Sequence, residues 1–250
     1  MKAVGVILAA GRGMRLGKLT AEMPKGMLEV GGSPLIEKQL DALRSFGIND
    51  IYLIVGFAAE KVEKALGGAA KYIRNKRWES TNNIYSLYLA RDVASNGFVL
   101  INSDDLFHPG ILKSLIESPY PDAISVDDHK KLGAEEMKVK LENGFLREIN
   151  KTMAPAHAHG EYIGIAKFGR EGSHKLFDVL ADFNRRDDLD GWYEEAFAVM
   201  APTQNIAAVS TGGLPWAEID TPQDWDRARQ DIWPEISGDY DGKRRTKKYK

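Results

Sequence analysis

The stretch Val4-Gly5-Val6-Ile7-Leu8-Ala9-Ala10-Gly11-Arg12-Gly13-Met14-Arg15-Leu16, followed by Pro24-Lys25, joins an apolar run to a glycine-rich loop with fixed positive charge. Residues 4–8 have the composition of a short strand that is buried on both faces. Gly11 and Gly13 permit backbone angles and close approaches that a side chain would block. Several amides in such a turn can point at one anion. Together with the nearby arginine and lysine, this pattern predicts a binding site for a nucleoside triphosphate.

The composition is that of a globular protein with an ordinary core. The chain has 250 residues, of which 43% are hydrophobic and 28% charged, and this length suits one large α/β domain. The net charge of -2 gives no electrostatic reason to expect nucleic acid or a membrane as a partner. The absence of cysteine excludes disulfides, thiol catalysis and cysteine-ligated zinc. We find no signal peptide and no apolar stretch near the roughly 20 residues that cross a bilayer, so we expect a cytoplasmic location.

Strand and helix patterns alternate along the chain, which predicts an α/β fold with a doubly wound, mainly parallel mixed sheet. In the second half the patterns are shorter, and Asn143-Gly144 is a strong hairpin signal. Thr221-Pro222 has the composition of a helix start. The expected strands are 4–8, 50–56, 71–74, 97–102, 123–126, 137–141, 145–149, 162–168, 206–209 and 216–220, and the expected helices are 34–46, 60–66, 84–91, 173–184, 193–200 and one that begins after residue 221.

Acidic and basic residues follow several of the expected strands. In open α/β sheets, ligands lie beyond the carboxyl ends of the strands. The loop 9–15, the pair Asp104-Asp105 and Asp220 all occupy such ends, and Lys25 follows the first of them. Magnesium is often held by one or two carboxylates together with substrate phosphates. The pattern therefore favours attack of a phosphate oxygen on the α-phosphorus of a triphosphate, a reaction that needs positioning and charge neutralisation but no protein nucleophile.

Four segments of the sequence resemble a known superfamily. Residues 8–16 with Pro24-Lys25 resemble the signature of the sugar-nucleotidyltransferase (GT-A-like) superfamily, and 103–107 and 218–222 resemble its two metal-binding strand ends. Within it, residues 78–87 are similar to the CTP:phosphocholine cytidylyltransferases and their relatives that act on inositol phosphate or phosphonates. The resemblance spans roughly residues 3–230 and implies a Rossmann-like nucleotidyltransferase fold with an inserted acceptor-binding lobe.

The resemblance also implies roles for individual residues. Arg15 and Lys25 are implied as the catalytic residues that neutralise the triphosphate, and Asp104 and Asp220 as the ligands of Mg²⁺. Ser103 stands where a glycine commonly precedes the first metal ligand. The residues implied to contact the nucleotide are Leu8, Ala9, Ala10, Gly11, Gly13, Asn82 and Ser103.

The acceptor site is less sharply defined by the sequence. By the same resemblance, segments 161–164 and 191–195 are expected to line it. The candidate acceptor-binding residues are Lys138, Lys151, Glu161, Tyr193 and Trp216. Trp192, Tyr193 and Trp216 could form an aromatic cage for a quaternary ammonium, or they could be packing residues. Lys138 and Lys151 could instead meet the acceptor phosphate, or they could be solvated lysines.

We divide the chain into one domain over residues 1–238 and a basic tail over 239–250. Residues 1–120 are expected to bind mainly the nucleotide, and 121–215 to form mainly the acceptor lobe. The tail holds six basic residues within 243–250 and is expected to be disordered, with binding to an anionic partner as the alternative.

These observations predict a magnesium-dependent cytidylyltransferase. It joins CTP to a phosphorylated small alcohol (phosphocholine-like or inositol phosphate) or to a phosphonate and releases pyrophosphate. A sugar-1-phosphate nucleotidyltransferase that uses UTP, dTTP or GTP is the alternative, and a nucleotide-sensing scaffold without turnover is a third. A dinucleotide site is disfavoured because the third glycine of its fingerprint is missing. A homodimer is compatible with the chain.

Overall fold

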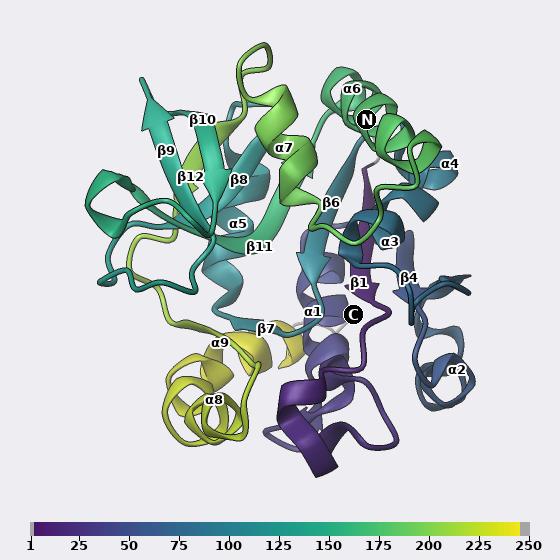
Figure 1. Cartoon of the computed structure of the whole chain (residues 1–250). Coiled ribbons are helices and arrows are strands. Elements are labelled where there is room, and N and C mark those ends of the chain that lie inside the picture. Colours follow the sequence, from purple (N-terminus) through teal and green to yellow (C-terminus); the bar gives the residue numbers. More distant parts are fainter. Residues whose placement is uncertain (1–2, 246–250) are drawn as a thin grey trace.

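One mixed sheet forms the centre of the molecule (Figure 1). The structure is a computed structural model that describes residues 3–245, with side chains to residue 240. Within these residues, nine strands form the sheet in the order β5-β4-β1-β6-β11-β8-β12-β10-β9. Its first four strands are parallel, as the sequence predicted. They are β5 (Lys71–Arg74), β4 (Ile51–Val55), β1 (Val4–Ala9) and β6 (Phe98–Asn102).

The other half of the sheet is mainly antiparallel. β11 pairs antiparallel with β6 and β8, and β12 then runs parallel to β8. The predicted hairpin joins β9 and β10, with left-handed backbone at both Asn143 and Gly144. The strands of this half are β8 (Ala123–Asp127), β9 (Lys138–Glu142), β10 (Phe145–Asn150), β11 (Gly160–Phe168) and β12 (Ala207–Ser210).

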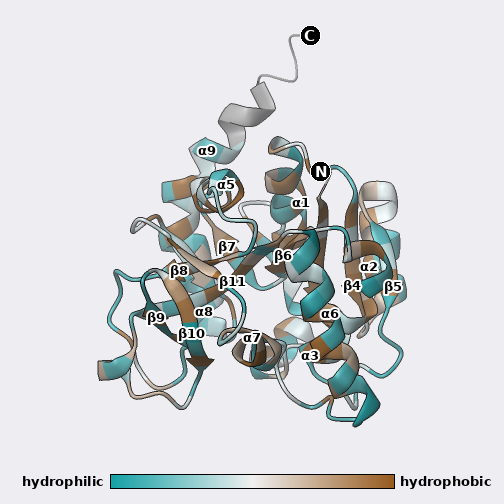
Figure 2. Cartoon of the chain, turned by 90° about the horizontal axis from the view of Figure 1, so that it is seen from above, coloured by the Kyte–Doolittle hydropathy of each residue, from teal (hydrophilic) through white to brown (hydrophobic). Residues whose placement is uncertain are grey.

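Helices cover both faces of the sheet, which confirms the doubly wound α/β class. Alternate residues of β1 belong to two separate cores: Ile7 to the one that includes residues of α1, α2, α5 and α9, and Val6 to the one that includes residues of α3, α4, α6 and α7. The central strands are hydrophobic and the outer turns of α2 and α6 are hydrophilic (Figure 2). The helices are α1 (Leu35–Ser45), α2 (Ala59–Leu66), α3 (Asn83–Leu89), α4 (Arg91–Ala94), α5 (Pro109–Glu117), α6 (Arg170–Arg185), α7 (Glu194–Met200), α8 (Pro222–Arg227) and α9 (Trp233–Arg245).

Short elements complete the chain. Five are short 3-10 or π-helical segments, and one pair of two-residue strands forms a small ladder before α1. They are η1 (Met14–Thr20), η2 (Lys25–Met27), η3 (Gly67–Ala69), η4 (Pro155–His157), the π-helical η5 (Ala228–Ile232), β2 (Glu29–Val30) and β3 (Ser33–Pro34).

One expected strand lies outside the main sheet. The sequence predicted that 216–220 adds to it, but β13 (Trp216–Glu218) pairs antiparallel with the unpredicted β7 (Asp105–Phe107) in a separate two-stranded sheet. Three residues of β7 are too few to give a periodic signal. This small sheet lies beside α8 and α9 (Figure 1) and ties the segment after β6 to the segment before α8.

The C-terminal segment also differs from the expectation. Residues 239–245, predicted to be disordered, continue α9, while 246–250 lie outside the described residues. Tyr240 is buried and donates a hydrogen bond to the carbonyl of Phe107, and Asp239 lies 3.0 Å from Nε2 of His108. Among the described residues, no helix combines the length and apolar character needed to span a bilayer. The cytoplasmic location and the homodimer stay predictions.

Candidate active site

The glycine loop turns directly from β1 towards Lys25. Gly13 has φ +76, a left-handed conformation that favours glycine. A Cβ there would lie only 3.0 Å from Cβ of Lys25, so the loop and this lysine approach closely. The hydroxyl of Thr20 donates to the Gly13 carbonyl at 2.8 Å and fixes the turn.

Three carboxylates meet next to this loop. Asp104 lies in the turn between β6 and β7, Glu218 ends β13, and Asp220 follows it. One ligand oxygen of each residue lies within 4.8 Å of the others. The small sheet sets this geometry, because Glu218 pairs with Asp105 and the amide of Ile219 donates to the Asp104 carbonyl at 3.0 Å. Oxygen ligands of this kind suit Mg²⁺.

A helix cap fixes the last of these carboxylates. The predicted helix start at Thr221 and Pro222 is confirmed, and Thr221 and Asp224 together form a capping box at the start of α8. The carboxylate of Asp224 also accepts from the backbone amide of Asp220 at 3.3 Å. The backbone that carries Asp220 is therefore held from its C-terminal side.

Lys25 and Arg15 balance part of the negative charge. Nζ of Lys25 forms ion pairs with Asp104 and, at 2.7 Å, with Asp220, and Arg15 contacts Asp220 at 2.5 Å. Burial alone would lower the pKa of Lys25, but the neighbouring carboxylates outweigh it and raise that pKa above its ordinary value. Burial would raise the pKa of Asp220, but Lys25 and Arg15 lower it.

Glu218 completes the cluster and was not among the expected ligands. Burial, followed by the charges of Asp104 and Asp220, raises the pKa of Glu218. The sequence did contain a signal for it. Glu218 stands two positions before Asp220, a spacing that puts two side chains on one side of an extended segment.

A cavity of about 400 Å³ brings most of the expected residues together. It begins at the glycine loop, includes the three carboxylates and extends to β11 and the residues before α7. The predicted residues that line it are Leu8, Ala10, Gly11, Gly13, Arg15, Lys25, Asn82, Ser103, Asp104, Lys151, Glu161, Trp216 and Asp220.

Three predicted residues do not line this cavity. Ala9 is buried in the sheet. Lys138 is buried, and its Nζ donates to the carbonyls of Ala134 and Glu136 at 2.9 and 3.0 Å, so its donors hold the chain before β9. Tyr193 is fully buried, and its hydroxyl donates to Oδ1 of Asn102 at 3.0 Å.

The end of the cavity near α3 has polar and aromatic residues to which the sequence assigned no individual role, although Trp78 and Ser86 lie in the segment 78–87 that carries the resemblance. Trp78 lines it, and so do Asn75 and Ser86, which are buried and joined by a hydrogen bond of 3.2 Å. Asn82, expected to contact the base, is the N-cap of α3 and also donates to the carbonyl of Asp190 at 3.2 Å. The side chain of Asn82 therefore holds the backbone of this wall in place through the amide of Asn83 and the carbonyl of Asp190.

The aromatic residues expected around the acceptor do not form a cage. Nζ of Lys151 lies 4.8 Å from the ring centre of Trp192, and Nζ of Lys130 lies 5.3 Å from that of Trp216. Tyr193 is buried, and the rings of Trp192 and Trp216 each lie next to a lysine of the protein. Glu161 is buried and pairs with Lys130 at 2.5 Å.

Among the described residues, two further carboxylates at the cavity wall each have one oxygen without a hydrogen bond. Within the described part of the chain, Oδ2 of Asp105 and Oε2 of Glu194 are buried and make no hydrogen bond. Burial raises the pKa of Asp105 well above its ordinary value and that of Glu194 to about 7. The sequence placed Asp105 at a strand end beside the predicted metal ligand, and it predicted that segment 191–195, which contains Glu194, lines the acceptor lobe, but neither residue was assigned a role of its own.

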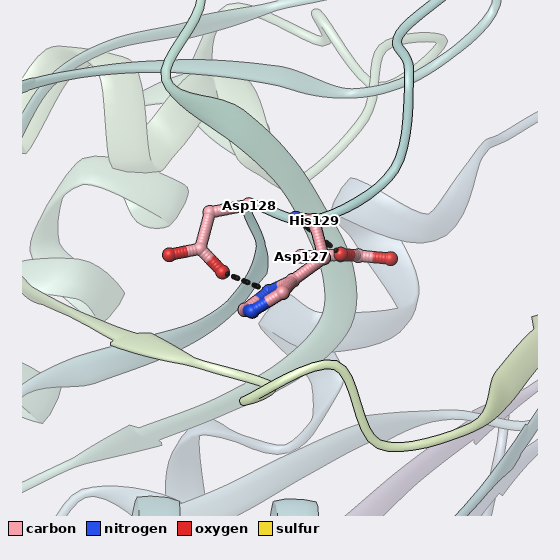
Figure 3. Close-up of side chains that lie close together, drawn as sticks. All are labelled: Asp127, Asp128 and His129. Atoms are coloured by element: carbon pink, nitrogen blue, oxygen red, sulfur yellow. Dashed lines mark hydrogen bonds and ion pairs between the residues drawn. The ribbon is translucent and has the colours of Figure 1, made fainter.

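A second acidic cluster lies at the end of β8 (Figure 3). Its side chains form hydrogen bonds and ion pairs within the protein. Asp127 accepts from the amide of His129 at 2.9 Å and from Nε1 of Trp216 at 2.7 Å. Asp128 lies 2.8 Å from Nδ1 of His129 and accepts from Ser210. These contacts support the position of Trp216 and the turn after β8.

Comparison with known proteins agrees with this geometry. The model of the family described as MobA-like NTP transferase domain matches residues 5–163. CMP-5'-(3-aminopropyl)phosphonate synthase of Streptomyces rubellomurinus is 28% identical over 237 residues, which are 88% of this chain and 37% of that protein. The bifunctional IPC transferase and DIPP synthase of Aquifex aeolicus is 27% identical over 92% of this chain and 52% of its own length. The chain thus spans about half the length, or less, of these relatives.

A solved structure shares the fold over nearly the whole chain. CTP:phosphocholine cytidylyltransferase from Streptococcus pneumoniae superposes with a TM-score of 0.76 at 22% identity. The match covers 92% of this chain and 99% of that one. The expected α/β nucleotidyltransferase fold is therefore confirmed.

Proposed function

Because the chain belongs to the family of MobA-like NTP transferase domains, we propose that it is a magnesium-dependent cytidylyltransferase whose acceptor carries a phosphate or phosphonate. One observation carries this proposal: Asp104, Glu218 and Asp220 converge with Lys25 and Arg15 in a cavity that begins at the glycine loop. The names of the two relatives, which concern a CMP-phosphonate and an IPC product, support the choice of CTP and of this acceptor class.

The reaction forms one P–O bond and breaks another. An anionic oxygen of the acceptor attacks the α-phosphorus of CTP. The bond from that phosphorus to the oxygen bridging towards the β-phosphorus breaks, and pyrophosphate leaves with the electron pair. The acceptor oxygen carries no proton, so no general base is needed. The protein's task is to place the reactants and balance charge.

The charged residues divide this task. Asp104, Glu218 and Asp220 are the residues that would hold Mg²⁺. A bound Mg²⁺ neutralises phosphate oxygens and supports the departure of pyrophosphate. Lys25 and Arg15, which lie against the same carboxylates, supply positive charge where charge grows at the α-phosphate.

The two ends of the cavity suit the two substrates. Trp78, Asn75 and Ser86 offer an aromatic side chain and polar groups of the kind a pyrimidine base uses. Lys151 lines the other part of the cavity and is the cation we assign to the acceptor's phosphate or phosphonate. Leu8, Ala10, Gly11, Gly13 and Ser103 are proposed contacts of the nucleotide.

The test is a substrate panel with the purified protein. We expect pyrophosphate release with CTP, Mg²⁺ and a phosphonate or phosphomonoester acceptor, and loss of release in EDTA. Faster release with UTP, dTTP or GTP and a sugar 1-phosphate would favour the alternative enzyme. Binding of CTP without pyrophosphate from any acceptor would indicate the scaffold instead.

A further inference from the structure

The position of Asp104 depends on a short turn, because this residue belongs to neither a strand nor a helix. β6 ends and β7 begins directly on either side of the pair Ser103 and Asp104. The carbonyl of Asp104 accepts from the amide of Ile219 at 3.0 Å, and the amide of Ser103 donates to the carbonyl of Leu8 at 3.2 Å. These two bonds hold the turn towards β1 and towards the segment after β13.

A glutamine of α1 binds the same turn from a third direction. Nε2 of Gln39 donates to the carbonyl of Asn102 and to the carbonyl of Asp105, both at 2.9 Å. A side-chain amide has two N–H donors, so both are used, one on each side of residues 103–104. Gln39 is 1% exposed and is not among the residues that line the cavity. It therefore acts on the backbone of the turn and not on a substrate.

The orientation of this amide follows from its neighbours. Both contacted groups are carbonyl oxygens, which only accept hydrogen bonds, so the nitrogen of Gln39 must face them. Within the described residues, Oε1 of Gln39 is buried and accepts no hydrogen bond. A buried amide oxygen without a donor costs free energy. The two bonds to the turn are thus what this side chain supplies, and they come with an unsatisfied oxygen.

The same helix packs against the segment that carries Lys25. A Cβ at Gly26 would lie 2.8 Å from Cδ1 of Ile36 and 2.8 Å from Cβ of Ser103. Because Ile36 and Gln39 stand three positions apart in α1, they lie on one face of the helix. This face of α1 therefore contacts both the turn and the residue that follows Lys25.

We propose that Gln39 is a positioning residue for the Mg²⁺ site: by binding the backbone on both sides of Asp104, it holds this carboxylate where it converges with Asp220. The inference rests on the proposed function, because it concerns the Mg²⁺ ligands assigned there. Replacing a residue that orients a metal ligand typically changes metal affinity or activity by about 10- to 100-fold. Loss of Gln39 removes the hydrogen bonds that join the turn to α1.

The test measures Mg²⁺ affinity directly. Calorimetry would titrate Mg²⁺ into the wild type and into Gln39→Met, each saturated with a non-reactive CTP analogue. Methionine is similar in size but has no N–H donor, so the variant is expected to bind Mg²⁺ about 10-fold more weakly, or weaker still. In steady-state kinetics, the Mg²⁺ concentration for half-maximal pyrophosphate release should rise by the same factor, while KM for the acceptor changes little.

Lys38→Met is the matched control on the same helix. Lys38 is also buried, and its Nζ donates to the hydroxyl of Ser33 at 2.6 Å, in the ladder before α1. This variant loses a buried donor too, so it is expected to lose stability but to keep the wild-type Mg²⁺ affinity. Wild-type Mg²⁺ affinity in Gln39→Met, or the same loss of affinity in both variants, would overturn the inference.

Two further variants keep the test decisive if Gln39→Met does not fold. Gln39→Asn keeps an amide but is one methylene group shorter, so it is not expected to reach both carbonyls and should also weaken Mg²⁺ binding. In an Asp104→Asn background, replacing Gln39 should have no further effect on Mg²⁺ affinity, because the ligand that it positions is already lost. A further loss of equal size in that background would contradict a role through Asp104.

Metal binding separates this inference from the proposed function. If the wild type releases no pyrophosphate from any substrate, but the Gln39 variants bind Mg²⁺ more weakly, the cytidylyltransferase is overturned and the positioning role is kept. Pyrophosphate release by the wild type, with unchanged Mg²⁺ affinity in both Gln39 variants, would do the reverse.

Discussion

Lys25 is the residue on which the charge balance of the site depends. It pairs with both Asp104 and Asp220, and its pKa is raised by these carboxylates, so it stays protonated across the physiological range. We expect Lys25→Ala and Asp220→Ala each to lower turnover by at least roughly 100-fold, as for loss of a positioned charge. Pyrophosphate release at saturating CTP measures this.

The control for this prediction lies on the same segment. Lys18 is exposed and does not line the cavity, so Lys18→Ala should leave turnover unchanged. Near-normal turnover of Lys25→Ala would remove this lysine from the mechanism.

Glu194 predicts a pH dependence of stability. Its pKa in the folded protein, about 7, lies above the ordinary value of 4.5, so the folded state binds a proton more tightly than the unfolded state. Ionisation of this buried carboxylate therefore lowers the free energy of unfolding by an amount on the order of 3 kcal/mol. This loss is absent below about pH 4.5 and complete above about pH 7. Urea unfolding of Glu194→Gln should show a gain relative to wild type that is larger at pH 8 than at pH 5. The same gain at both pH values would show that burial does not raise the pKa of Glu194 in the folded protein.

Single residues of the site were predictable to the extent that a local motif fixed them. Gly13, Lys25, Asp104 and Asp220 occupy motif positions and lie where expected. Lys138 had no such motif, and nothing in its neighbours showed that its ammonium would bind two backbone carbonyls.

Among the elements, β11 is the one whose backbone most directly shapes the acceptor end. Gly164→Ala would place a methyl group 2.3 Å from Oδ2 of Asp105 and would also keep φ at +77. We expect a loss of about 1–3 kcal/mol in the free energy of unfolding and a higher KM for the acceptor, measured by urea unfolding and steady-state kinetics.

Gly144 supplies the comparison for this prediction. It also has positive φ (+83), but a Cβ there would meet nothing within 4 Å. Gly144→Ala therefore measures only the loss in the free energy of unfolding that comes from placing a non-glycine residue at positive φ. If Gly164→Ala loses no more stability than Gly144→Ala and keeps its KM, Asp105 is not packed against β11.

The elements also show which contacts a sequence pattern can reveal. The Asn143-Gly144 hairpin and the Thr221 cap are local, and both were predicted and confirmed. The pairing of β7 with β13 joins segments more than 100 residues apart, as in Glu218 with Asp105, and no periodicity within either segment indicates its partner.

At the scale of the whole molecule, Trp233 holds the last helix, α9, against the face of the sheet that carries α1. The ring of Trp233 lies so near Gly31 that a Cβ at Gly31 would fall 2.0 Å from Nε1, and Nζ of Lys38 lies 4.2 Å from the ring centre. We expect Trp233→Ala to lower the free energy of unfolding by about 3 kcal/mol, measured by urea unfolding.

A truncation supplies the contrast. Deletion of residues 246–250 removes none of these contacts, so it should leave both stability and turnover near the wild-type values. A large loss of activity in this truncation would favour a role for the basic tail, and unchanged stability of Trp233→Ala would show that α9 is not fastened by this ring.

The ion pair between Lys25 and Asp220 joins positions 195 residues apart, and Glu218 comes almost as late in the chain. A polypeptide released early by the ribosome, or truncated by a nonsense codon before residue 218, therefore has the glycine loop and its lysine but only one of the three converging acids. Such unfinished copies lack two of the three side chains of the acidic cluster. The acidic cluster is therefore complete only once translation has passed residue 220.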